Sequence, residues 1–190
     1  QREVVYDYRN DVLDSSDTRV LIDEAIEKGI REKVAEYVPE DGKSSEPIQY
    51  GALINWANTT FPVGIGSSEA DFENKTFDEI VQFLIERVRN AYNVKTRDGQ
   101  PQIVQDLERM ILLNAIDRLW QEHLYALDAL KEGVGLRTHG QKDPLIEFKI
   151  EAYNIFAELM RNINNEVLSN LFRGMAQLQA FEEFLRQAAL

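Results

Sequence analysis

The chain has 190 residues, of which 44% are hydrophobic, and this is enough for one or two small domains with apolar cores. It contains no cysteine, which excludes disulfides and thiolate metal sites, and its net charge of −12 argues against a general nucleic-acid surface, which needs clustered lysine and arginine. No run of about 18 apolar residues is present, so no membrane-spanning segment is predicted, and no secretory signal pattern is visible.

The first part of the chain predicts two helices. Apolar residues recur at helical spacing within residues 4–12 and again within residues 20–37. Residues 14–17 between them are all Asp or Ser, which suits a turn and the N-cap of the second helix. Pro39 is expected to end that helix, because its ring cannot continue the hydrogen-bond ladder.

Residues 39–75 are interrupted by prolines and glycines, so only one short helix, from Ile48 to Trp56, is predicted within them. Several aromatic residues in this stretch favour a packed, irregular layer over a disordered linker. They are Tyr50, Trp56, Phe61 and Phe72.

Thr76 and Glu79 match the capping box, in which each side chain satisfies the free backbone N–H of the other residue. Apolar residues within 77–92 share one face of the helix that this box opens. Residues 98–101, Asp-Gly-Gln-Pro, are expected to end it, and Pro101 is well placed to begin the next helix.

A long helix is predicted from about Gln102 to Glu132, a length of roughly 45 Å at about 1.5 Å per residue. Gly133 and Gly135 are expected to end it, Pro144 to restart a helix, and Gly174 to break the chain before a final helix. The two long helices carry facing apolar stripes, which are Leu112, Ile116, Leu119, Trp120, Leu124, Leu127 and Leu130, and Leu145, Phe148, Ala152, Ile155, Phe156, Leu159, Ile163 and Val167. Facing stripes joined by a short linker predict an antiparallel two-helix hairpin, so the expected fold class is all-α with no strand.

No residue pattern in the chain matches an active site. Residues 64–68, GIGSS, lack the lysine of a phosphate-binding loop and are interpreted as an ordinary loop. Glu122-His123 lacks the H-E-x-x-H spacing of a zinc site, so His123 is interpreted as a partly buried helix-face residue with a hydrogen-bond partner. The many Asp and Glu residues are expected on exposed helix faces. We therefore assign no catalytic residue and no metal ligand.

The linker of the predicted hairpin is long and polar. Residues 136–144 read LRTHGQKDP, whereas a minimal turn between two helices needs about two to five residues. On physical grounds alone, this linker is either a solvated loop or a contact surface presented at the end of a rigid two-helix lever.

Two stretches of the chain resemble the SecA preprotein translocase ATPase family. Residues 113–124, LNAIDRLWQEHL, are followed by the pattern of Gly133, Leu136-Arg137, Gln141-Lys142-Asp143-Pro144, Glu147, Lys149 and Glu151. The opening residues QREVVY, with Arg9 and Leu13, resemble the scaffold helix that precedes the SecA wing. The residues between these stretches and the last residues, 173–190, match only loosely.

The resemblance implies a fold and a role. SecA couples ATP hydrolysis to the movement of unfolded preproteins through the SecY channel, and this chain would be its helical scaffold and wing portion. The implied divisions are the first part of the scaffold (1–28), an irregular helical wing (29–106), the two-helix finger of the scaffold (107–172) and a C-terminal helix (173–190).

Family roles carry over to two sets of residues. Trp120 and Leu124 fall on the finger helix that regulates ATP hydrolysis in the family. The fingertip, which would contact preprotein and channel, comprises Arg137, Thr138, His139, Gly140, Gln141 and Lys142. The family commonly has Gly-Tyr where this chain has Thr138-His139, which puts a role for a phenol at the tip in doubt. Ile150 also stands where a basic residue is usual.

The implied partners are unfolded preprotein, the SecY channel complex and the nucleotide-binding domains of the parent SecA, with a homodimer allowed and no nucleic acid. No cofactor is expected in this chain, because ATP and Mg²⁺ would bind elsewhere in the parent protein, and the chain alone is not expected to be an enzyme. Its beginning within a helical pattern also suggests part of a longer protein. The expected location is the cytoplasm, peripherally at the inner face of the bacterial plasma membrane. The rival interpretation is a free-standing helical interaction or scaffolding module with no link to an ATPase.

Overall fold

The computed structural model describes residues 1–43, 47–136 and 143–188, and these ranges contain helices and loops without a strand. The elements are α1 (Arg2–Asp14), α2 (Thr18–Tyr37), α3 (Tyr50–Thr60), α4 (Ser67–Ala70), the 3-10 helix η1 (Phe72–Asn74), α5 (Phe77–Thr96), α6 (Pro101–Leu136) and α7 (Pro144–Ala188). The predicted all-α fold class is confirmed. Within the described ranges, no helix is both long and apolar enough to cross a membrane.

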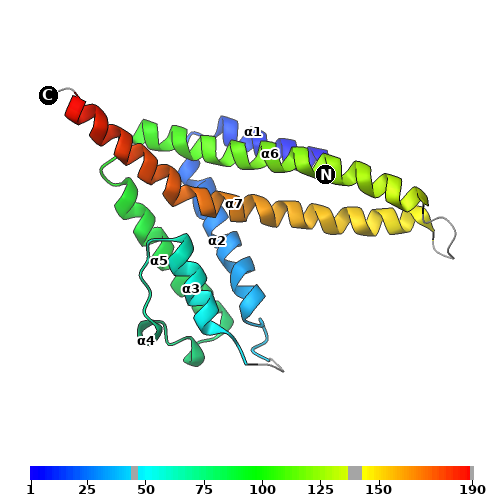
Figure 1. Cartoon of the computed structure of the whole chain (residues 1–190), viewed down its shortest axis with the longest axis horizontal. Coiled ribbons are helices and arrows are strands. Elements are labelled where there is room, and N and C mark those ends of the chain that lie inside the picture. Colours follow the sequence, from blue (N-terminus) through cyan, green and yellow to red (C-terminus); the bar gives the residue numbers. More distant parts are fainter. Residues whose placement is uncertain (44–46, 137–142, 189–190) are drawn as a thin grey trace.

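The helices form two units, which Figure 1 shows at an angle to each other. α6 and α7 lie side by side as a long antiparallel hairpin, and α1 lies along α6; we call these three helices the hairpin unit. The elements α2, α3, α4, η1 and α5 project from its side, and we call them the lateral unit. α2 packs against α5 within the lateral unit and against α6 and α7 of the hairpin unit.

The helix boundaries follow the local sequence signals. The Asp17 side chain accepts a hydrogen bond from the Arg19 N–H at 3.0 Å, which caps α2. The capping box is present at the start of α5, because the Thr76 N–H donates to Glu79 Oε2 at 2.7 Å and the Glu79 N–H donates to Thr76 Oγ1 at 3.3 Å. α2 ends before Pro39 and α6 begins at Pro101, as predicted.

The segment with many prolines and glycines packs as the predicted irregular layer. Edge-to-face aromatic contacts join Tyr50 to Phe72 and Phe72 to Phe83, with ring centroids 6.4 and 5.6 Å apart. Phe61, only 2% exposed, makes similar contacts with Trp56 and with Phe172 of α7. The predicted short helix is present as α3, although it starts and ends later than expected. The GIGSS segment is a loop whose last two residues begin α4.

Two predicted helix breaks are wrong, and both were predicted at glycines. α6 continues through Gly133 and Gly135 to Leu136, and α7 continues through Gly174 to Ala188. At Gly174 a Cβ atom would lie 3.1 Å from Ile111 Cδ1 of α6, so the glycine allows the two helices to approach closely. At Gly133 the helix is supported by the next residue, because Val134 is 5% exposed. Packing between helices thus outweighs the low helix propensity of glycine.

Gly133→Ala is expected to stabilise the chain by about 0.5–1 kcal/mol, because alanine is preferred over glycine inside a helix and no atom lies within 4 Å of the new Cβ. Urea unfolding followed by far-UV circular dichroism measures this change. Gly64→Ala is the matched control, because Gly64 has a φ of +58° and should lose stability on the same substitution. A destabilised Gly133→Ala variant would mean that α6 ends at this glycine.

The expectation that carboxylates lie on exposed helix faces fails at Glu108 of α6. This side chain is 1% exposed, and its two oxygens accept hydrogen bonds from Thr18 of α2 and Tyr92 of α5. The cause lies in the tertiary structure. The helices α2, α5 and α6 meet at this point, so residues from all three enclose the Glu108 side chain.

Candidate functional site

The hairpin of α6 and α7 has a buried root and an exposed outer end. At the root, where α1 and α2 also pack against it, Leu112, Ile116, Ile163 and Val167 are at most 1% exposed. Toward the tip, the described parts of α6 and α7 lie beside each other without a third helix (Figure 1), and a helix pair can bury only its seam. Large apolar side chains therefore remain more than half exposed there. They are Tyr125, Leu145, Ile146, Ile150 and Tyr153.

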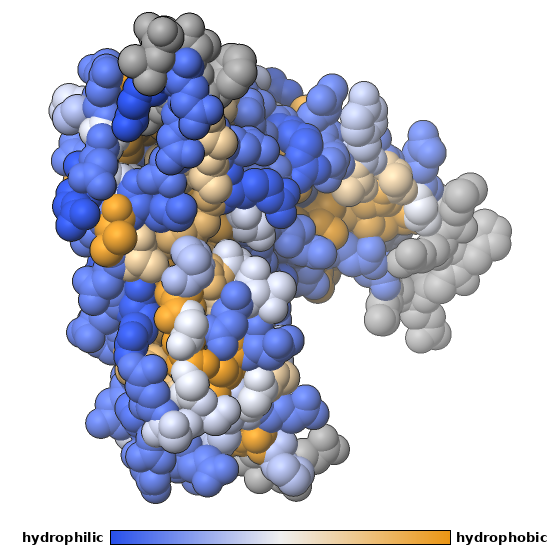
Figure 2. Space-filling view, turned by 60° about the vertical axis from the view of Figure 1, so that its left-hand side comes forward, coloured by the Kyte–Doolittle hydropathy of each residue, from blue (hydrophilic) through white to orange (hydrophobic). Residues whose placement is uncertain are grey.

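The surface of this outer end is partly apolar. Figure 2 shows hydrophobic side chains reaching the surface of the hairpin near its tip, whereas hydrophilic residues cover most of the same view. Tyr125 and Tyr153, which are 68% and 70% exposed, are not among the predicted contact residues. The available signal was that both fall outside the apolar stripes, so the seam could not bury them.

Two members of the predicted stripes are wrongly placed. Leu124 is 37% exposed and Leu145 is 58% exposed, whereas His123 is 5% exposed. His123 is therefore buried in the seam between α6 and α7, where the apolar stripe predicted its neighbour Leu124. Of the two residues predicted on the regulatory helix, Trp120 packs against the core and Leu124 faces outward.

The predicted fingertip, Arg137 to Lys142, lies outside the described residues, so its role stays a prediction. α6 ends at Leu136, and α7 begins at Pro144 with Asp143 as its cap, because the Leu145 N–H donates to Asp143 Oδ1 at 2.8 Å. The tip is therefore attached directly to two regular helices.

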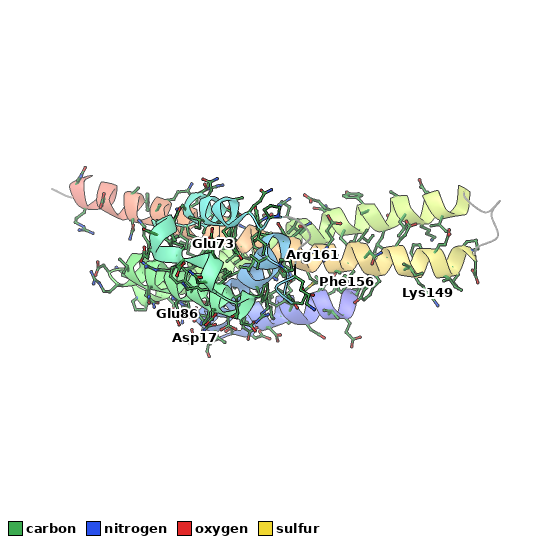
Figure 3. All side chains as sticks on the ribbon, turned by 90° about the horizontal axis from the view of Figure 1, so that it is seen from below. Asp17, Glu73, Glu86, Lys149, Phe156 and Arg161 are labelled. Atoms are coloured by element: carbon green, nitrogen blue, oxygen red, sulfur yellow. The ribbon has the colours of Figure 1, made fainter. Side chains whose placement is uncertain are left out.

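An aromatic cluster lies where the hairpin leaves the rest of the structure. The Trp120 ring stacks on His123, with centroids 5.4 Å apart, and His123 lies 5.8 Å from the ring of Phe156. His123 Nε2 is 3.0 Å from Gln1 Oε1, and Gln1 Nε2 donates to the Ala152 carbonyl at 3.0 Å. Figure 3 labels Phe156 on α7, beside the start of α1. This confirms that His123 is a packed helix residue with a hydrogen-bond partner.

Ion pairs connect the helices at the root of the hairpin. Arg9 of α1 makes a two-pronged ion pair with Asp117 of α6, at 2.7 and 3.2 Å. Arg118 of α6 pairs with Glu122 on its own helix and with Glu166 across the seam on α7. These pairs are accessible to solvent, so they add little to stability, and their main effect is on the register of the helices.

The arrangement offers contact surface and stiffness, and no catalytic geometry is visible in the described ranges. Among those residues no group of three or more His, Cys, Asp or Glu side chains could hold a metal ion. A shallow groove of about 210 Å³ runs along the seam beside His123 and Leu159, with Glu122 and Glu158 at its edge.

The stability of the chain is expected to fall as pH decreases below about 6.5, the value at which histidine titrates in the unfolded chain. Burial lowers the pKa of His123 in the folded chain, so the unfolded state binds the proton first and is favoured as the pH falls toward this lowered pKa. His123→Gln places an uncharged amide, which can still form a hydrogen bond, at this position and should flatten the dependence of stability on pH. Urea midpoints measured between about pH 7.5 and 5.5 test it, because most carboxylates remain ionised there. Parallel pH profiles for the two proteins would contradict it.

Sequence comparison identifies related proteins. The profile of the SecA Wing and Scaffold domain family matches residues 1–175. The chain is 35% identical over 173 residues to the protein translocase subunit SecA of Thermodesulfovibrio yellowstonii, covering 91% of this chain and 18% of that protein. It is 38% identical over 187 residues to the protein translocase subunit SecA of a Picosynechococcus species, covering 94% of this chain and 19% of that protein. The chain thus spans about a fifth of the length of these relatives.

Proposed function

Because the chain belongs to the SecA wing and scaffold family, we propose that it is a mechanical, non-catalytic part of an ATP-driven protein translocase. The fingertip, residues 137–142, contacts unfolded preprotein and the SecY channel complex. Trp120 and Leu124 lie on the helix that contacts the nucleotide-binding domains of the longer protein. ATP and Mg²⁺ bind in those domains, and the protein works in the cytoplasm at the inner face of the plasma membrane.

The observation that carries this proposal is the contrast between the two ends of the hairpin. Bending the root would expose Ile116, Ile163 and their neighbours, each of which contributes about 1.5–3 kcal/mol when fully buried. The outer end instead presents exposed apolar side chains, which mark sites of interaction when they gather on one surface. A rigid root and an outer end with exposed apolar side chains suit a lever that transmits movement to varied partners.

The proposed divisions of the chain are 1–28, 29–106, 107–172 and 173–190, as the family resemblance implies. α2, α6 and α7 each run unbroken across one of these three boundaries. In the proposal, these continuous helices join the scaffold to the wing and to the C-terminal helix, so movement of one part is passed to the next. A homodimer is compatible with this arrangement.

Site-specific crosslinking tests the proposal. A photo-crosslinking amino acid at position 139 of the longer protein is expected to form adducts with a preprotein halted during transport and with the channel, in an ATP-dependent manner. Position 98 is the matched control, because it lies in the exposed turn between α5 and α6, at the opposite end of the hairpin from the tip (Figure 1). Adducts from position 98 without any from position 139 would contradict the proposed contact.

A further inference from the structure

The lateral unit is joined to the hairpin unit by two crossings of the chain. One crossing runs from α1 into α2 through residues 15–17, and the other runs from α5 into α6 through residues 97–100. Both crossings are short, so the contacts that the first turn of α2 and the last turns of α5 make with α6, together with the packing of α2 and α5 on α7, determine the orientation of the lateral unit.

A single buried carboxylate holds both of these helix ends. Glu108 of α6 accepts a hydrogen bond from Thr18 Oγ1, in the first turn of α2, at 2.5 Å. Its other oxygen accepts a hydrogen bond from Tyr92 Oη, near the end of α5, at 2.8 Å. Thr18 and Tyr92 are both 0% exposed. The two crossings therefore converge on one side chain, from opposite directions along the sequence.

Arg19 supports the same contact. Its guanidinium lies 3.9 Å from Glu108 Oε1 and stacks over the Tyr92 ring at 4.2 Å. It also donates to Asn93 Oδ1 of α5 at 2.5 Å. Further along α2, Asp23 and Glu27 pair with Arg89 of α5. Polar contacts and ion pairs thus join α2 to α5 along their interface, with Glu108 of α6 at the end next to the hairpin.

Burying a carboxylate is costly, and an apolar residue at such a position commonly gives equal or greater stability. Glu108 instead makes the contact between the helices directional, because each of its oxygens accepts a hydrogen bond from one particular hydroxyl. We infer that Glu108, through Thr18 and Tyr92, is a positioning residue that sets the orientation of the lateral unit relative to the hairpin. This inference concerns the geometry of the chain itself, so it holds or fails independently of any contact with preprotein.

The chain has no cysteine, so Glu73→Cys and Lys149→Cys create unique sites for two spin labels. Both positions are exposed, and Figure 3 shows them in different units, Glu73 in the lateral unit and Lys149 on the hairpin. Pulsed electron paramagnetic resonance on the 190-residue chain then measures the distribution of distances between the units. Glu108→Ala is expected to broaden or shift this distribution. Glu108→Gln should restore it, because an amide can accept from Tyr92 and donate to the Thr18 hydroxyl.

Asp128→Ala is the matched control, because Asp128 is an exposed carboxylate on the same helix, away from both crossings. It should leave the distances unchanged. If Glu108→Ala does not fold, as judged by circular dichroism, Tyr92→Phe and Thr18→Val each remove one hydroxyl from the contact, and either change is expected to broaden the distribution. An unchanged distribution in every folded variant would overturn the inference, as would equal broadening by Glu108→Gln and Glu108→Ala.

Discussion

Replacing residues 137–142 with a glycine–serine segment of equal length is expected to abolish preprotein transport by the longer protein while ATP hydrolysis continues. The replaced segment lies between Leu136 and Asp143, at the ends of two regular helices, so the lever itself is preserved. The change removes the arginine, histidine, glutamine and lysine side chains that the proposal places against the moving polypeptide. ATP-dependent uptake of a preprotein into membrane vesicles, with phosphate release measured in the same reaction, separates the two activities.

A second replacement shows whether any exposed polar turn matters for transport. Arg97→Ser with Asp98→Ser changes two side chains that are 73% and 80% exposed at the other end of the hairpin, and it should leave transport intact. Arg137→Gln with Lys142→Gln removes only the charges of the tip, and it should lower transport if charge contributes to the grip. Continued transport after replacement of the whole tip would count strongly against the proposed function.

Gly29→Val is expected to lower the free energy of unfolding by about 1–3 kcal/mol, the range for overpacking a buried site. Gly29 lies in the middle of α2 against α7, and a Cβ there would be 2.5 Å from Leu168 Cδ1 and 3.5 Å from Asn164 Cβ. Leu168 is 1% exposed and has little room to move. Valine is a better helix former than glycine by only a few tenths of a kcal/mol, so the steric conflict decides the sign.

The same substitution at an open site provides the comparison. A Cβ added at Gly133 meets no atom within 4 Å, so Gly133→Val should be neutral or slightly stabilising. In a double-mutant cycle, Leu168→Ala should relieve part of the cost of Gly29→Val, with a coupling of about 0.5–3 kcal/mol, because the two side chains compete for one space. Urea unfolding of the four proteins measures it. Strict additivity would show that α2 and α7 do not meet as closely as the structure indicates.

Local signals in the sequence were sufficient to place most helices. The capping box of Thr76 and Glu79, the cap at Asp17 and the prolines at positions 39 and 101 each act through their own backbone neighbours. Local signals failed at Gly133, Gly135 and Gly174. A glycine lowers helix propensity, but packing against a second helix compensates for this loss, and the sequence pattern does not contain that packing energy.

The candidate site divides in the same way. The two long helices, the lack of an active-site pattern and the family resemblance could all be read from residue order, and the family is confirmed by the match over residues 1–175. The exposure of Leu124, Tyr125 and Tyr153 could not be predicted from the sequence, because it depends on where α1 and α2 stop covering the hairpin.

The sequence by itself therefore determined the helices and their caps, because these depend on contacts a few residues apart. Only the tertiary structure decided which side chains are enclosed. Glu108 was expected to be exposed because it is charged, yet it is buried because the start of α2 and the end of α5 meet it from distant parts of the chain. Gly29 has no local requirement for glycine, yet Leu168 leaves no space for a side chain there. Burial depends on all the elements that surround a residue, and no single helix pattern contains that information.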